Sequence, residues 1–321
     1  MTNLAEGIPW VVPGLAPIIG HSAALGQAVA LARRAARTRL PVFLVAPTGC
    51  GKELFAHHIH RWSGRPGEIV DVNCAALPES LMESELFGHA AGSFTGARHV
   101  KPGLIEIADG TSCLLDEIPS LSLPLQAKLL RVVETQELRR VGEVAKRRVD
   151  VRFLAAAQDD VWDRVATGAF RKDLYHRLAG IVIRIPALVE RPGDVLPLAR
   201  QFAASMGLGL DPAAERVLLE YEWPGNVREL RMVIERSAFL ADAQVIPRRA
   251  IADAIEIGAA EGQGPRGRAI RARLDQGRAV RGDRVRLTAL VADHGGSIAR
   301  TSRELRLPRA TLQRWLREVG L

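Results

Sequence analysis

Residues 43 to 53 read FLVAPTGCGKE, an apolar run followed by a glycine-rich turn and a lysine. An apolar run ends at Ala46, two glycines flank Cys50, and Lys52 opens the helical pattern ELFAHHIHRW. A glycine-rich turn between a strand and a helix directs backbone N–H groups at phosphates, and its lysine reaches the terminal phosphates. The stretch therefore predicts a nucleotide-phosphate loop made of Ala46, Pro47, Thr48, Gly49, Cys50, Gly51, Lys52 and Glu53.

The loop departs from the common phosphate-loop pattern at both ends. Ala46 replaces the first glycine, and Glu53 replaces the serine or threonine whose hydroxyl binds Mg²⁺. The cation must therefore use other ligands and water. The segment SCLLDE supplies them, because Asp116 at the end of a buried strand would hold Mg²⁺ and Glu117 would orient and deprotonate the attacking water. Two solvated acids at a strand end are the alternative.

Apolar, strand-like runs alternate with amphipathic helical patterns as far as residue 187. These runs are short and bounded by turns, at residues 41–46, 69–72, 112–117, 149–157 and 181–186. The alternation predicts an α/β class, a P-loop parallel sheet with helices on both faces. From residue 191 to 257 the pattern is helical only, which predicts a small separate helical domain.

Charge is distributed unevenly along the chain. The net charge is +8. From Glu261 onward there are 14 arginines and 6 acidic residues, so this part carries a net charge of 14 − 6 = +8. The net charge of the first 260 residues is therefore zero. A neutral body with a basic tail predicts a polyanion bound by the tail. A solvated, disordered arginine tail is the alternative.

Several classes of protein do not fit the composition. No apolar run approaches the ~18 residues of a membrane span, and the N-terminus lacks a secretion signal. Cys50, Cys74 and Cys113 are an odd set without metal-ligand spacing, which predicts a reducing cytoplasmic location. His57 and His60 share a helical face without a third ligand, so packing or surface roles are favoured over metal. Oxidation of Cys50 would block the phosphate loop, but a small buried thiol is the default.

Five segments follow one another in a characteristic order: GCGKE, NCAALPESLMESELFGHAAGSFTGA, LLDEI, GAFRKDLYHRL and WPGNVREL. From about Ile18 to Ile257 they resemble the AAA+ domain of bacterial sigma-54-dependent enhancer-binding activators. The end of the chain resembles the Fis-type helix-turn-helix of the same family. The resemblance implies ATP and Mg²⁺ as cofactors and a ring, in the family a hexamer, as the working form.

Site roles follow from the resemblance residue by residue. Asn73 matches the asparagine that positions the catalytic glutamate, here Glu117. Arg171 and Arg177 match arginines that reach the γ-phosphate bound by a neighbouring subunit, where they neutralise charge in the transition state. The nucleotide-binding set also takes in Ile19, Gly20 and the lid arginine of sensor II, Arg228.

Sensor I, after the fourth strand of the sheet, departs from the family. Its threonine and asparagine are Ala157 and Gln158 here. Ala157 cannot hydrogen-bond phosphate or water, and Gln158 has one more methylene and one more torsion than asparagine. This change motivates an alternative function, a DNA-binding regulator that holds nucleotide and hydrolyses it poorly.

A lone phenylalanine between glycines marks a second functional segment, GSFTGA. It resembles the family's GAFTGA, a surface loop that rises with the nucleotide state and contacts sigma-54. An inert turn, the alternative, leaves the aromatic residue unexplained. The predicted sigma-54 contact consists of Gly92, Ser93, Phe94, Thr95, Gly96 and Ala97.

The last 26 residues read as helix, turn, helix, with Ser297 as first cap and Pro308 at the start of the second helix. The second helix predicts DNA recognition by a dimer; a hairpin for dimerisation alone is the alternative. The candidate DNA contacts are Arg306, Arg309, Ala310, Thr311, Gln313, Arg314 and Arg317.

These readings give five predicted regions: a short segment (1–17), the α/β ATPase part (18–187), the helical lid (188–257), a Gly/Arg-rich linker (258–283) and the helix-turn-helix (284–321). The predicted function is an ATP-hydrolysing activator that binds enhancer DNA, assembles from dimers into a ring and remodels the closed complex of the sigma-54 RNA polymerase holoenzyme.

The expected location is the cytoplasm, at the nucleoid, with no membrane partner. Because few residues precede the ATPase part, control by a separate regulatory protein in trans, by expression level or by assembly is expected. A chaperone-like unfoldase, a further alternative, would leave the helix-turn-helix without a role.

Overall fold

The phosphate-loop stretch begins inside a five-stranded parallel sheet. The strand β1 (Val42–Val45) lies between β8 (Arg152–Ala157) and β9 (Ile181–Arg184), and β5 (Ser112–Asp116) and the edge strand β2 (Val70–Asn73) complete the sheet. The order is β2-β5-β8-β1-β9, and each neighbouring pair is parallel. Parallel strands need crossover connections, and the intervening helices supply them.

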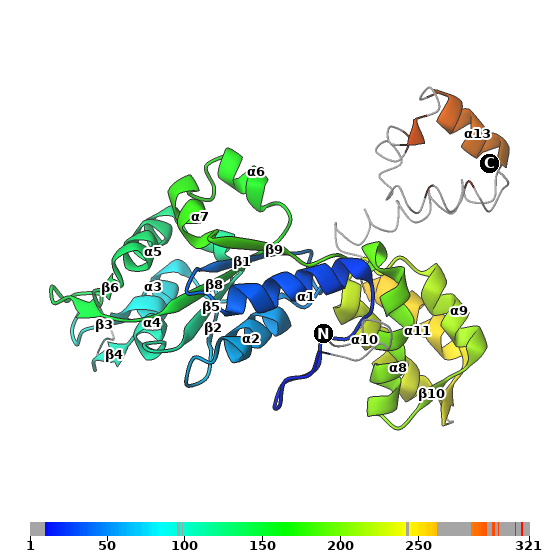
Figure 1. Cartoon of the computed structure of the whole chain (residues 1–321), viewed down its shortest axis with the longest axis horizontal. Coiled ribbons are helices and arrows are strands. Elements are labelled where there is room, and N and C mark those ends of the chain that lie inside the picture. Colours follow the sequence, from blue (N-terminus) through cyan, green and yellow to red (C-terminus); the bar gives the residue numbers. More distant parts are fainter. Residues whose placement is uncertain are drawn as a thin grey trace.

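The structure is a computed structural model of the chain. It describes residues 10–94, 97, 99–241, 244–261 and 284–293, with single positions at 297, 298, 301, 312 and 316. In Figure 1 the α/β part and the helical lid lie side by side, and the chain passes from one to the other after β9.

Alternate residues of the central strands point to opposite faces of the sheet. Phe43 and Val45 of β1 join one core, and Val42 and Leu44 join the other. Helices cover both faces, which confirms the predicted fold class. The core that contains Val42 and Leu44 packs against α1 (Ala23–Ala36) and α2 (Lys52–Ser63). The core that contains Phe43 and Val45 packs against α3 (Glu79–Phe87), α4 (Leu104–Ile107), α5 (Leu123–Thr135), α6 (Val161–Ala166) and α7 (Lys172–Leu178).

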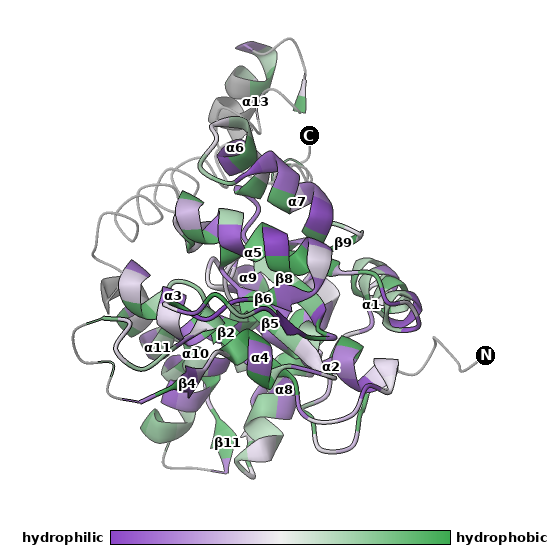
Figure 2. Ribbon diagram, turned by 90° about the vertical axis from the view of Figure 1, so that its left-hand side faces the viewer, coloured by the Kyte–Doolittle hydropathy of each residue, from purple (hydrophilic) through white to green (hydrophobic). Residues whose placement is uncertain are grey.

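Hydropathy along these helices agrees with this two-sided packing. In Figure 2 they show green and purple stretches in alternation, as expected for amphipathic helices with one face on the sheet. The helix α1, for example, buries Leu25, Val29 and Ala32 and leaves arginines of its last turn outside.

Two short hairpins extend from the α/β part. β3 (Gly88–His89) pairs antiparallel with β4 (Lys101–Pro102), and the GSFTGA segment lies between them. β6 (Glu137–Leu138) pairs with β7 (Arg147–Arg148). Main-chain bonds join the two hairpins, because Val141 donates to Gly88 O at 2.9 Å and Ala90 donates to Val141 O at 3.0 Å.

The lid has its own core around the buried Trp223. α11 continues to Glu261, past the predicted lid boundary at 257, because Gly258 does not break a helix that alanines and Glu261 extend. The lid elements are η2 (Leu188–Glu190), η3 (Pro192–Asp194), α8 (Val195–Ser205), α9 (Pro212–Glu220), α10 (Asn226–Leu240) and α11 (Arg248–Glu261), with β10 (Gly209–Leu210) parallel to β11 (Val245–Ile246).

The predicted helix-turn-helix region is described only in part. Helix α13 (Arg284–Asp293) lies at its start, and Leu312 and Leu316, within the second predicted helix, are buried. The candidate DNA contacts fall outside the described residues, at Arg306, Arg309, Ala310, Thr311, Gln313, Arg314 and Arg317. Within the described part of the chain, no helix has the length and apolar character needed to cross a membrane.

Candidate nucleotide-binding and catalytic site

The candidate site lies at the carboxyl ends of the sheet strands. The phosphate loop follows β1, Asn73 ends β2, Asp116 ends β5, and Gln158 follows β8. Strand ends of a parallel sheet meet at one edge, and this is where α/β folds bind ligands. The loop, Asn73, Asp116 and Glu117 line a cavity of about 670 Å³, which the lid closes from the opposite side.

The phosphate loop owes its shape to two glycines in the left-handed region. Gly49 has φ of +84° and Gly51, just before α2, has φ of +96°. Lys52 is 7% exposed, and its Nζ donates to Ala46 O at 3.1 Å and lies 3.8 Å from Glu117 Oε1. A buried ammonium at the start of a helix gives this end of the cavity strong positive potential, which fits a phosphate chain.

The acidic pair, Asp116 and Glu117, lies beside this lysine. Burial raises the pKa of Asp116, while the nearby charge of Lys52 opposes that rise. Glu117 has φ of +51°, an uncommon backbone state for a side chain of this size, and its N–H donates to Asp116 Oδ1 at 3.0 Å. A partly buried carboxylate is the hard oxygen donor that Mg²⁺ prefers, so the residues present fit the cation.

Gln158 hydrogen-bonds the candidate base, and Asn73 does not. The Gln158 amide Nε2 donates to Glu117 Oε1 at 3.3 Å and to Oε2 at 3.2 Å. Asn73 lines the same cavity, but its Oδ1 accepts from the N–H of Ala75 at 2.9 Å, and no Asn73–Glu117 bond occurs among the described residues. Gln158, and not Asn73, holds the Glu117 carboxylate in this arrangement.

An apolar pocket and a lid arginine complete the cavity. Ile18, Ile19, Leu198, Phe202 and Val227 offer surfaces that suit a flat nucleobase. The lid's Arg228 also lines the cavity. Its backbone N–H donates to the backbone oxygen of Gly49 at 3.2 Å.

Gly20, predicted in the nucleotide-binding set, is closely packed against its neighbours. A Cβ at this position would come within 2.4 Å of Leu25 Cδ2 and 2.7 Å of the Asp194 carboxyl. Gly20 is absent from the described residues that line the cavity, so its glycine is explained by close packing against Asp194.

Asn226, which the sequence reading passed over, fastens the lid to the phosphate loop. Its Nδ2 donates to Thr48 O at 3.0 Å, and its Oδ1 accepts from the N–H of Leu188 at 2.8 Å. The side chain is buried and the backbone has φ of +55°. An Asn after Pro-Gly at a helix start was the available signal, because asparagine tolerates this conformation better than most residues.

Asp194 is a second unpredicted anchor. Its buried carboxylate accepts from the N–H of His21 at 2.7 Å, from the N–H of Ser22 at 2.9 Å and from Ser22 Oγ at 2.7 Å. The guanidinium of buried Arg191 lies 3.9 Å away. The lid side of the chain is thereby joined to the start of α1.

We expect Asp194→Ala to lower the free energy of unfolding by about 3–5 kcal/mol, because the buried guanidinium of Arg191 loses its counter-charge and three partly buried donors lose their acceptor. Urea denaturation followed by circular dichroism measures the change. Asp211→Ala is the matched control, since Asp211 only caps α9 and its loss should cost about 1 kcal/mol. Equal losses in the two variants would contradict the anchoring role of Asp194.

Arg171 and Arg177, the arginines predicted to reach a neighbouring subunit's nucleotide, do not line this cavity. Arg171 precedes α7, is exposed, and binds Asp173 through Nε at 3.0 Å and Nη2 at 2.7 Å. Arg177 is exposed and lies 3.9 Å from Glu134. Neither belongs to the described residues that line the chain's own cavity.

The GSFTGA segment exposes its aromatic residue. Phe94 is 44% exposed, and its ring packs edge-on to His89 with centroids 5.0 Å apart. Ala97 is buried and accepts from the N–H of Gly92 at 2.7 Å, which closes the base of the loop, and Ser93 packs against the hairpin at Gly142. Thr95 and Gly96 lie outside the described residues.

The thiol in the phosphate loop is poorly suited to oxidation. Cys50 is 4% exposed, and burial raises the pKa of its thiol to about 11. Thiolate is the reactive form of cysteine, so the packing role is favoured.

Comparison with known proteins places the chain. The family model "Sigma-54 interaction domain" matches residues 18–184, and an "AAA+ ATPase lid domain" model matches residues 189–266. The nitric oxide reductase transcription regulator NorR2 of Cupriavidus necator is 41% identical over 349 residues, covering 99% of this chain and 67% of the relative. The Nif-specific regulatory protein of Klebsiella pneumoniae is 44% identical over 245 residues, covering 74% of this chain and 47% of that protein.

A solved structure agrees with these relatives. NtrX from Brucella abortus in complex with ATP has a TM-score of 0.67 and 31% identity, covering 95% of this chain and 69% of that one. The chain spans about half to two thirds of the length of the curated relatives. The sequence motifs, the sheet order and these matches agree, and the chain belongs to the family of sigma-54-dependent transcriptional activators with an AAA+ ATPase domain.

Proposed function

We propose that this protein hydrolyses ATP and uses the energy to activate transcription by sigma-54 RNA polymerase. The observation that carries the proposal is the convergence of Lys52, Asp116 and Glu117 in one cavity closed by the lid. A buried ammonium and two carboxylates gathered at one end of a cavity suit the binding of a phosphate chain and its transfer to water. The ATP complex of NtrX supports ATP as the nucleotide.

Each group of the site has a separate task in this reaction. The loop N–H groups and Lys52 would bind the phosphate chain, and Asp116 would hold Mg²⁺, which would neutralise charge on the phosphates. Glu117 orients the attacking water and accepts its proton. Gln158 hydrogen-bonds the Glu117 carboxylate, and that bond must loosen or rearrange for Glu117 to reach the water. Arg228 carries the nucleotide state to the lid.

The reaction requires a ring of subunits. Arg171 and Arg177 are exposed and remote from the chain's own cavity, so they suit a role in a neighbour's cavity. Shared sites link hydrolysis to movement between subunits. The exposed Phe94 of the GSFTGA segment is the proposed contact that passes this movement to sigma-54.

The basic tail is the proposed enhancer-binding part, acting as a dimer. We expect a truncated chain of residues 1–261, which retains all of α11, to keep ATPase activity and to lose enhancer affinity, because the 14 arginines of the tail are removed. Gel shifts at several salt concentrations measure the loss.

Point variants refine this expectation. Arg309→Ala or Arg314→Ala should weaken binding by about 1–3 kcal/mol where the side chain reads a guanine. Specific enhancer binding by the truncated chain would overturn the assignment of the tail.

The second candidate is a DNA-binding regulator that holds nucleotide without turning it over. The close Gln158–Glu117 contact favours it, because the amide occupies the carboxylate oxygens that would otherwise contact the attacking water. Phosphate release, measured with Mg²⁺ at concentrations that form rings, separates the two functions. Sustained release supports the ATPase, whereas nucleotide binding without release in demonstrated rings supports the regulator. Control by a separate protein in trans is compatible with either.

A further inference from the structure

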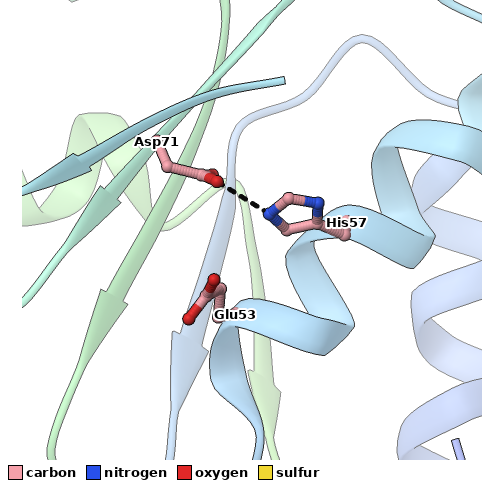
Figure 3. Close-up of side chains that lie close together, drawn as sticks. All are labelled: Glu53, His57 and Asp71. Atoms are coloured by element: carbon pink, nitrogen blue, oxygen red, sulfur yellow. Dashed lines mark hydrogen bonds and ion pairs between the residues drawn. The ribbon is translucent and has the colours of Figure 1, made fainter. Parts of the chain in front are cut away.

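Three potential metal ligands from two elements converge beside the phosphate loop (Figure 3). Glu53 and His57 are four residues apart on α2, and Asp71 lies on the edge strand β2. Their ligand atoms all lie within 4.8 Å of one another. His57 Nε2 and Asp71 Oδ2 are 2.9 Å apart. Helical spacing predicts that His57 and His60 share a face of the helix. His60, however, is buried and hydrogen-bonds Ser112 and the carbonyl of Gly67.

The three donors match the preferences of a first-row transition metal. One imidazole nitrogen and two carboxylate oxygens form a ligand set for Zn²⁺ that leaves a coordination position for water. Tetrahedral Zn²⁺ with ligand bonds of about 2.1 Å keeps its ligands about 3.4 Å apart. The present ligand atoms lie within 4.8 Å of one another, so the exposed carboxylates must rotate for the three to reach that spacing.

The backbone that carries these ligands is rigid. Phe55, Ala56 and Ile59 of α2 are buried in the core, and β2 is hydrogen-bonded to β5 along its length. Residues four apart on a helix share one face, so Glu53 and His57 both face the strand that carries Asp71. Within the described part of the chain Glu53 has no hydrogen-bond or ion-pair partner, whereas His57 and Asp71 bond each other.

We propose that Glu53, His57 and Asp71 form a binding site for a divalent transition metal, with Zn²⁺ as the probe. The site borders the nucleotide cavity, because Glu53 follows Lys52 and also lines that cavity. It is distinct from the proposed Mg²⁺ position at Asp116, at the end of the neighbouring strand. The alternative is a simple ion pair between His57 and Asp71 that ties α2 to the sheet edge.

The test is calorimetric titration of the full chain with Zn²⁺, in the presence of Mg²⁺ and ADP to occupy the nucleotide site. The wild type should bind one equivalent, and His57→Ala and Asp71→Asn should each weaken that site about tenfold or more. His176→Ala, which removes an exposed histidine of α7, is the matched control and should bind as the wild type does.

Thermal melting provides the second readout. Zn²⁺ should raise the Tm of the wild type and of His176→Ala, but not of His57→Ala. Glu53→Gln alters an exposed side chain, so it tests the site even if the other variants fold poorly. Unchanged Zn²⁺ affinity in Glu53→Gln, or no saturable Zn²⁺ binding by the wild type, would overturn the proposal in favour of the ion pair.

Discussion

Replacing Glu117 by glutamine should leave ATP binding intact and lower kcat by about 10²–10⁴-fold. Glutamine keeps the size of the side chain but cannot take a proton from the attacking water. Lys52→Ala should instead abolish binding, because the buried ammonium that reaches the phosphates is lost. Phosphate release at saturating ATP and titration with a fluorescent ATP analogue separate turnover from binding.

Gln158→Ala is the informative companion to Glu117→Gln. It removes the amide that now contacts the carboxylate and leaves the base in place. An increased rate would show that Gln158 restrains Glu117, and a decreased rate would show that it supports the catalytic geometry. Hydrolysis by Glu117→Gln at the wild-type rate would refute the assignment of the catalytic base.

Arg171→Ala should lower kcat by about 10³–10⁵-fold, the range that arginine fingers contribute to phosphoryl transfer. Because the residue would act in a neighbour's site, a mixture of Arg171→Ala and Glu117→Gln chains should regain partial activity. Some interfaces of the mixed ring then join an intact Glu117 to an intact Arg171. Phosphate release across mixing ratios measures the rescue.

Arg164→Ala is the matched control for Arg171. Arg164 is an exposed arginine paired with Asp160, and its removal should change stability and turnover little. Normal turnover by Arg171→Ala, or no rescue at any ratio in rings shown to be mixed, would count against shared sites.

The sequence predicted the sheet and its phosphate loop because both depend on local patterns. Apolar runs, a glycine turn and a lysine before a helix lie within a few residues of one another. The sequence could not predict the anchors of the lid, because their partners are distant along the chain. Asn226 bonds Thr48 across 178 residues, and Asp194 bonds His21 across 173. Only the folded chain brings such partners together.

Two smaller differences between prediction and structure also involve residues that are far apart in the sequence. The resemblance assigned contact with Glu117 to Asn73, whereas the longer Gln158 side chain reaches Glu117 from the next strand end. The metal-ligand cluster was missed because Asp71 is on an edge strand and nothing local marks it as a neighbour of His57. The prediction for Thr95 stays a prediction, as do those for the DNA contacts.

We expect this chain to couple ATP hydrolysis to promoter opening through the GSFTGA segment. Thr95→Ala should change stability by less than about 0.5 kcal/mol, because it removes one hydroxyl and one methyl from a loop. The variant should therefore still hydrolyse ATP and shift enhancer DNA. Loss of ATP hydrolysis and DNA binding together with promoter opening would instead show that the loop supports the fold or the ring.

The most direct measurement is open-complex formation on a sigma-54 promoter, detected by permanganate reactivity of the melted strands. Purified wild-type chain should open the promoter with ATP and fail with a non-hydrolysable analogue. Thr95→Ala should fail with ATP even though its phosphate release is normal. Normal promoter opening by Thr95→Ala, or opening by the wild type without hydrolysis, would contradict the account.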